Sequence, residues 1–159
     1  MHWKQLAAHS LILGGFVLYC IFLAGPITDR LESIPGESRL RDISLPGVSG
    51  NIQCSIESQI NTYTIDIQGW AFIKGEDYKG CQTFIVLKSA DKTYVFDTLQ
   101  ANRPDVTRAF KNMNLDLDWS GLYAWIPLRK IESGEYLIGV YIKKDNVEAL
   151  QYTGKSVTK

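Results

Sequence analysis

Residues Thr83–Asp97 read TFIVLKSADKTYVFD, which is two short apolar runs separated by a polar turn. The runs TFIVLK (83–88) and TYVFD (93–97) are rich in the β-branched and aromatic residues that strands favour. Ala90-Asp91-Lys92 fits a tight hairpin between them. The stretch therefore predicts two neighbouring antiparallel strands.

Similar runs lie on both sides of this hairpin. Apolar residues alternate with polar ones at Ile52, Cys54 and Ile56, and again at 63–67, while further short runs occupy 122–126, 136–142 and 149–152. About seven short strands with turn signals between them predict an all-β fold, an immunoglobulin-like β-sandwich. Tyr136 follows a turn at 131–135 that resembles the tyrosine corner of such sandwiches, so we expect its hydroxyl to bond back to preceding backbone.

The first 28 residues have a different character. No Asp, Glu, Lys or Arg lies between Lys4 and Asp29, and a helix over residues 5–25 is about 30 Å long, one hydrocarbon thickness. This favours a single transmembrane helix as the N-terminal membrane anchor (1–28). A cleaved signal peptide is the alternative, but the apolar run is long and its basic leader is thin.

Residues 29–50 contain the turn dipeptides Pro35-Gly36 and Pro46-Gly47 among several serines, which predicts a linker or stalk. The β-sandwich domain is then expected at 51–159, with Leu40, Ile43 and Leu45 able to pack on it. We expect a single-pass protein of the cell membrane with this domain outside the cytoplasm. The local Lys/Arg count favours the opposite orientation, but long domains translocate largely regardless of such charges.

Two cysteines, Cys54 and Cys81, fall in the predicted domain. A disulfide between them would suit an extracytoplasmic location. Two unpaired cysteines acting as small apolar residues are the alternative, because pairing cannot be deduced from sequence.

Charge and histidine content narrow the functional classes. Seventeen basic and seventeen acidic residues cancel, so nucleic acid is not an expected partner. Both histidines, His2 and His9, precede the predicted domain, which leaves that domain without the commonest general base and metal ligand. We therefore expect a non-enzymatic protein without a cofactor or a metal site.

The segment Ala101–Phe110, ANRPDVTRAF, interrupts the strand patterns. Pro104 suits the first turn of a helix, and an aspartate follows where negative charge is favourable. Val106 and Phe110 would share one helix face. We expect a short helix that crosses from one sheet to the other with these two side chains in the core.

The same region also supplies a candidate site. Arginine forks and aromatic faces suit recognition of an anion or a sugar. The candidate ligand-binding residues are Arg103, Asp105, Arg108, Trp119 and Tyr123. The architectural interpretation is favoured, because each residue of the helical segment has a local structural reason to be there.

The segment NMNLDLDWSG (112–121) alternates polar and apolar residues and matches half of a calcium-loop template. Pro127 stands where the bidentate glutamate belongs, which disfavours calcium. The alternation also fits an extended segment with Leu115 and Leu117 turned inward.

Several short motifs occur together: GWAF (69–72), YVF (94–96), RPDV (103–106), SGL (120–122) and Gly134-x-Tyr136. In this combination the chain resembles small extracytoplasmic sandwich domains of prokaryotic cell-envelope proteins, some of them attached to glycosyltransferases or membrane acyltransferases. The resemblance covers residues 52–142 and implies an accessory role, because none of these motifs is catalytic.

These observations lead to two hypotheses. The first is a membrane-anchored binding or accessory module associated with cell-surface glycan. The second is a structural subunit of a membrane protein complex, assembled through the transmembrane helix and one sandwich face. An enzyme using carboxylates such as Asp116 and Asp118 is disfavoured by the histidine-free domain.

Overall fold

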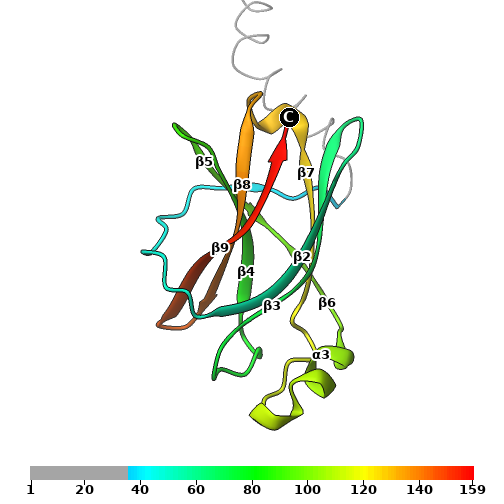
Figure 1. Ribbon diagram of the computed structural model, residues 1–159, viewed down its shortest axis with the longest axis vertical. Helices are drawn as coiled ribbons and strands as arrows, with labels where there is room; N and C mark the ends of the chain where they lie inside the picture. Colours follow the sequence, from blue (N-terminus) through cyan, green and yellow to red (C-terminus); the bar gives the residue numbers. More distant parts are fainter. Residues whose placement is uncertain (1–35) are drawn as a thin grey trace, which may run out of the picture. The chain divides into compact units, whose positions relative to one another are not determined.

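The computed structural model describes residues 36–159, which form two antiparallel sheets packed face to face (Figure 1). The strands are β1 Leu40–Arg41, β2 Ile52–Ile60, β3 Thr64–Ile73, β4 Gln82–Lys88, β5 Thr93–Asp97, β6 Leu99–Ala101, β7 Gly121–Pro127, β8 Glu135–Lys144 and β9 Val147–Thr158. The helices are α3 Pro104–Ala109 and the short 3-10 turns η2 Lys111–Met113 and η3 Leu128–Lys130. One sheet has the order β1-β5-β4-β8-β9 and the other β2-β3-β7-β6, so the predicted β-sandwich is confirmed.

The predicted hairpin is the β4–β5 pair. Lys88 lies opposite Thr93, and the amide of Ser89 donates to the carbonyl of Lys92 at 2.8 Å to close the turn. The five central residues of β4 are buried, so the strand is covered on both faces. This explains why its sequence is continuously apolar instead of alternating.

The main core lies between the sheets, and β7 shows how the sequence selects it. Leu122, Ala124 and Ile126 are buried, whereas Tyr123 and Trp125 point outward and are exposed. Successive side chains of a strand point to opposite faces, so this alternation fixes which face of the sheet meets the core. A smaller apolar cluster covers the outer face of the five-stranded sheet around Phe84, Val86, Val95, Tyr141 and Leu150.

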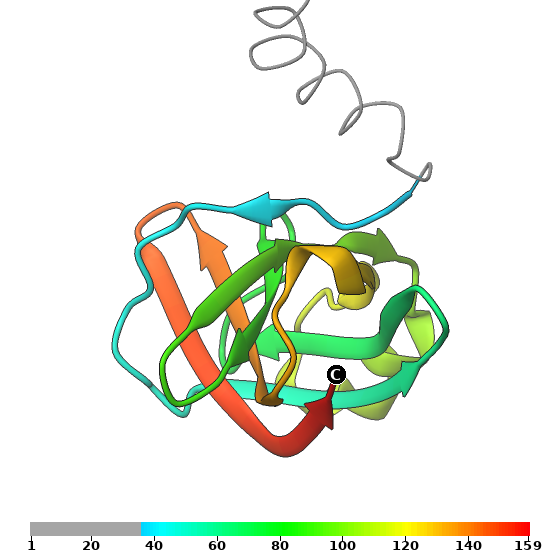
Figure 2. The same ribbon diagram turned by 90° about the horizontal axis from the view of Figure 1, so that it is seen from above.

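Residues 36–50, here called the strap, correct the predicted domain boundary at residue 51. The compact unit begins at Gly36. Ser38 bonds the backbone of Trp125 in one sheet, while Leu40 pairs with Phe96 in the other. The rest of the strap follows the outside of the domain (Figure 2), where Ile43 and Leu45 pack on the smaller apolar cluster. This part of the predicted linker is therefore built into the domain.

Helix α3 forms where Pro104 predicts it, with Pro at its start, an acidic residue in its first turn and a basic one in its last. Val106 is buried as expected, and Phe110 packs partly buried against Trp70 and Phe72. The expected crossing is wrong, however. The helix joins β6 to β7, which are neighbours in one sheet, and the chain changes sheet earlier, at Thr98 between β5 and β6.

Tyr136 is buried near the start of β8, and its hydroxyl donates to the carbonyl of Glu132 at 3.0 Å. The predicted backbone-directed hydrogen bond is confirmed. Burial raises the pKa of this phenol, so the hydroxyl keeps the proton that it donates.

Cys54 and Cys81 are free thiols, so the candidate disulfide between them is not formed. Their charged surroundings differ: Lys155 of β9 acts on Cys54, whereas Lys144 of β8, Glu76 and Asp145 act on Cys81. Burial raises the pKa of both thiols. They fit the alternative in which both cysteines act as small apolar residues.

The predicted transmembrane helix and the beginning of the predicted linker lie outside the described residues. Between Gly36 and Lys159, no helix is long and apolar enough to cross a bilayer.

Candidate functional site

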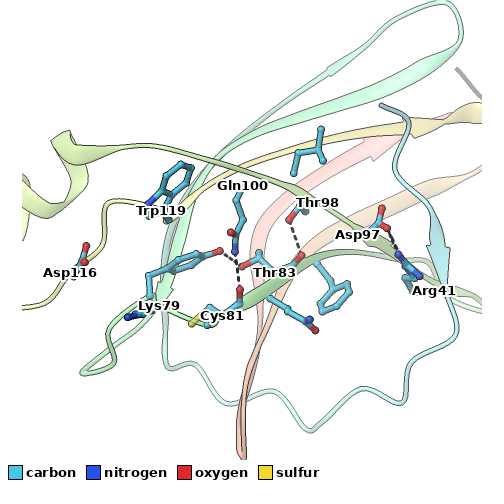
Figure 3. Close-up of a pocket in the computed structure, with 14 residues that line it drawn as sticks. Arg41, Lys79, Cys81, Thr83, Asp97, Thr98, Gln100, Asp116 and Trp119 are labelled. Carbon is cyan, nitrogen blue, oxygen red and sulfur yellow. Dashed lines mark hydrogen bonds and ion pairs between the residues drawn. The ribbon is translucent and has the colours of Figure 1, made fainter. Parts of the chain in front are cut away.

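An open cleft of about 1230 Å³ lies where the chain passes from one sheet to the other (Figure 3). One wall comes from the loop before β4 and the first residues of that strand, and the other from the crossing between β5 and β6. The lining residues are Arg41, Tyr78, Lys79, Gly80, Cys81, Gln82, Thr83, Phe84, Asp97, Thr98, Leu99, Gln100, Asp116 and Trp119.

The sheet crossing creates the cleft. β5 ends at Asp97, opposite Phe84, so the chain preceding Phe84 has no β5 residue beside it. Two side chains supply hydrogen bonds to this backbone in place of β5: the Thr98 hydroxyl donates to the carbonyl of Thr83 at 2.8 Å, and the Gln100 side-chain amide donates to the carbonyl of Cys81 at 2.8 Å. Because unpaired backbone groups are costly to bury, these bonds hold the floor of the cleft in place.

Trp119 provides the large aromatic surface of the cleft, with 55% of the residue exposed. Its loop is fixed to α3: the hydroxyl of Thr107 donates to the Asp118 carboxylate at 2.6 Å and accepts the amide of Leu117 at 3.1 Å. The next residue, Ser120, is buried, and its carbonyl accepts a hydrogen bond from the amide of Ala71 in β3. The indole is therefore presented from a rigid support, although the side chain itself remains accessible.

Polar groups surround this ring. Lys79 and Asp116 lie toward the Trp119 end of the cleft, and Arg41 and Asp97 form an ion pair at the other end, with a closest distance of 2.7 Å (Figure 3). On the floor, the hydroxyls of Tyr78 and Thr83 are 2.6 Å apart. Burial raises the pKa of Tyr78, so this phenol is neutral at physiological pH.

Four of the five predicted ligand-binding residues are electrostatic neighbours: Arg103 interacts with Asp105 and Tyr123, and Asp105 also interacts with Arg108. Arg103 donates two hydrogen bonds to Asp105, at 2.9 and 2.8 Å. These bonds hold the pKa of the Asp105 carboxyl below its usual range and raise the pKa of the guanidinium. Arg108 is exposed on α3, and Tyr123 lies on the outer face of β7. Of the five, Trp119 alone is among the residues that line the cleft.

Sequence reasoning missed the other wall of the cleft. Arg41 lies in the predicted linker, Asp97 ends the predicted strand 93–97, and Thr98 and Gln100 follow that strand without any recognisable motif. They line one cleft with Lys79 because the chain changes sheets at Thr98. No local pattern in the sequence marks that crossing.

The calcium-like segment has structural roles. The Asp116 carboxylate accepts the amide of Asp118 at 3.2 Å, and the amide of Asp116 donates to Asp77 at 2.8 Å. Among the residues that the structure describes, no three acidic, histidine or cysteine side chains are grouped as metal ligands.

Comparisons with known proteins add no assignment. The chain matches no protein-family model, no curated protein and no solved structure. The cleft and the sequence therefore carry the functional argument.

Proposed function

We propose that this chain is a membrane-anchored, extracytoplasmic, non-enzymatic binding module, and that its cleft binds a cell-surface glycan. The observation that carries this proposal is the exposed Trp119 ring in an open cleft with polar walls. A ligand with one apolar face and many hydroxyl groups along its edges matches such a surface.

The chemistry of the lining supports a sugar. A sugar ring has an apolar face of C–H groups that can stack on an indole, and aromatic side chains contribute large contact area with little conformational freedom to lose. Lys79, Gln82 and Asp116 offer donors and acceptors for hydroxyl groups around that ring. Because the charges along the cleft have both signs, a largely neutral glycan is the best match.

Strand order supports the immunoglobulin-like assignment. β2-β3-β7-β6 corresponds to the A-B-E-D sheet of such domains, and β5-β4-β8-β9 to a C-F-G sheet with one additional C′ strand. The bond from Tyr136 to Glu132 adds the corner expected of that fold. The resemblance to accessory sandwich domains of prokaryotic envelope proteins fits the same assignment, and the uncharged apolar run at 5–25 supports the anchor.

The proposal is tested with the full-length chain in detergent micelles on an array of cell-envelope glycans. We expect binding to a restricted set of glycans, and its loss in Trp119→Ala. Tyr63→Ala is the matched control, because it removes another exposed aromatic ring that lies outside the cleft. Absence of binding to every envelope glycan, or equal loss in both variants, would contradict the proposal.

A structural subunit of a membrane protein complex is the second candidate. Leu99 and Tyr123 lie opposite each other on neighbouring strands, and both are exposed on the sandwich face that such a partner would cover. Isolation of the full-length chain from native membranes should then recover a partner in fixed stoichiometry. Charged substitution of Leu99 should release it.

A further inference from the structure

The two sheets end in four edge strands, β1, β9, β2 and β6, which differ in how well they are protected from pairing with another chain. β1 has two residues and β6 has three, so neither offers a long edge. The edge of β9 is bonded by the strap, where the amide of Ser49 donates to the carbonyl of Leu150 at 2.9 Å, and it carries the charged Lys155 further along. Short length, coverage and lysine are the usual protections of an edge strand. β2, with nine residues, is the edge that remains to be examined.

The first half of β2 is closed by side chains of β9. The amide of Ile52 donates to the Gln151 side chain at 3.1 Å, and the carbonyl of Ile56 accepts the Lys155 ammonium at 2.6 Å. These two bonds also show which backbone groups face away from β3. Because the direction alternates along an antiparallel strand, the even-numbered residues of β2 direct their N–H and C=O groups toward its free edge.

The second half of β2 is open. Residues 57–60 are all exposed, and Ile60 keeps 44% of its surface accessible although it is a large apolar residue. Ser58 and Ile60 each direct an N–H and a C=O to the edge, and no described residue bonds these four groups. An edge of this kind is a template for one more strand.

The sequence of this edge matches itself. A two-fold interface requires a surface that is complementary to its own copy, and an antiparallel pair of β2 strands must place even-numbered residues opposite even-numbered ones. With Ser58 opposite Ser58 of the second copy, Glu57 lies opposite Gln59, so a carboxylate meets an amide donor. On the other side of the strand, the exposed Ile60 lies opposite Ile56 of the second copy. Centring the pair on Glu57 would instead place two carboxylates opposite each other, which is unfavourable.

We infer that two copies of this chain associate through the open edges of β2, in the register that places Ser58 on the two-fold axis. The four-stranded sheets of the two copies then form one continuous antiparallel sheet. The carbonyl of Ile56 keeps a second lone pair for this pairing beside its bond from Lys155. Because the open segment is short, the association is weak and depends on concentration. The inference goes beyond the proposed function, since no residue of β2 lines the cleft.

The test is sedimentation velocity of the full-length chain in detergent micelles over a range of protein concentrations. Ser58→Pro removes an N–H that points away from β3, so the ladder between β2 and β3 is kept while the edge loses a donor. Ser58→Ala is the matched control, because it changes the same side chain and keeps the N–H. We expect the wild type and Ser58→Ala to form dimers as concentration rises, and Ser58→Pro to stay monomeric with an unchanged melting temperature.

A second pair of variants tests the register and decides the case if Ser58→Pro lowers the melting temperature. Gln59→Lys places an ammonium opposite Glu57 of the second copy, and Gln59→Glu places a carboxylate there, twice in each dimer. We expect the dissociation constant to fall in the first variant and to rise in the second, each by about two- to thirty-fold. Asp66 lies opposite Gln59 within one copy, but it is present in monomer and dimer alike, so its effect cancels.

Three results would overturn the inference. The first is a wild-type chain that stays monomeric at every concentration. The second is equal association of Ser58→Ala and a folded Ser58→Pro, which would show that copies meet through another part of the chain. The third is a shift of the dissociation constant in the same direction in both Gln59 variants, which would exclude the register.

Discussion

Substitution of Phe110 tests whether the segment ANRPDVTRAF (101–110) has a structural role, as its position between β6 and β7 indicates. Its ring makes edge contacts with Trp70 and Phe72, at centroid distances of 5.4 and 5.1 Å, and packs against the main core. Truncating a core Phe to Ala costs about 3–5 kcal/mol, and each aromatic pair contributes about 0.5–1.5 kcal/mol beyond its buried area. Because Phe110 is only partly buried, we expect the lower end for Phe110→Ala, about 3 kcal/mol.

This loss is measurable by thermal and urea denaturation of the full-length chain, followed by circular dichroism. For a domain of this size, 1 kcal/mol corresponds to about 4 °C, so the melting temperature should fall by about 12 °C. Arg108→Ala is the control on the same helix, because this exposed side chain should change stability by less than about 0.5 kcal/mol. If Phe110→Ala were as stable as Arg108→Ala, the helix would not be anchored to the core and the architectural interpretation would be refuted.

Three further predictions concern the fold. Tyr136→Phe should destabilise the domain by about 1 kcal/mol, because it removes the hydrogen bond to Glu132 while keeping the ring. A change near zero would show that this hydrogen bond does not stabilise the domain. Gly69→Ala should cost about 3 kcal/mol or more in the same denaturation assay, because Gly69 has φ of +154° and its new Cβ would lie 2.0 Å from the carbonyl oxygen of Ser55. The folded-state pKa of Asp105 is lowered by its hydrogen bonds from Arg103. The stability that this pair contributes is therefore present above the unfolded carboxyl pKa, about 4, and is lost as pH falls through the folded-state pKa. Acidification should lower the free energy of unfolding less in Asp105→Asn than in the wild type, and parallel pH profiles of the two proteins would contradict this.

The sequence predicted the β-sandwich well where a local pattern has a local cause. TFIVLK and TYVFD form β4 and β5 because their apolar residues are buried and a short polar turn joins them. Tyr136 was predictable because its hydrogen bond reaches only four residues back. Pro104 marked the start of α3 for the same reason: its effect on the backbone is local.

The features that the sequence did not reveal depend on contacts between distant residues. β1 is two residues long and forms only because Arg39 and Arg41 meet Asp97 beside β5. The turn dipeptides of the strap predict a linker, and although the packing expected of Ile43 and Leu45 is confirmed, Leu40 is exposed and instead pairs through its backbone with Phe96. The cleft likewise depends on a change of sheet at Thr98, so Trp119 alone of the predicted site residues was found in it.

The glycan-binding cleft is the central claim, and the indole N–H signals of the chain's four tryptophans test it most directly by NMR. The full-length chain in detergent is titrated with fragments of the cell-envelope glycan selected on the array. The account predicts a saturable shift of the Trp119 signal while those of Trp70 and Trp125 stay in place. A titration that moves Trp125 and leaves Trp119 unchanged, or that moves neither, would contradict it.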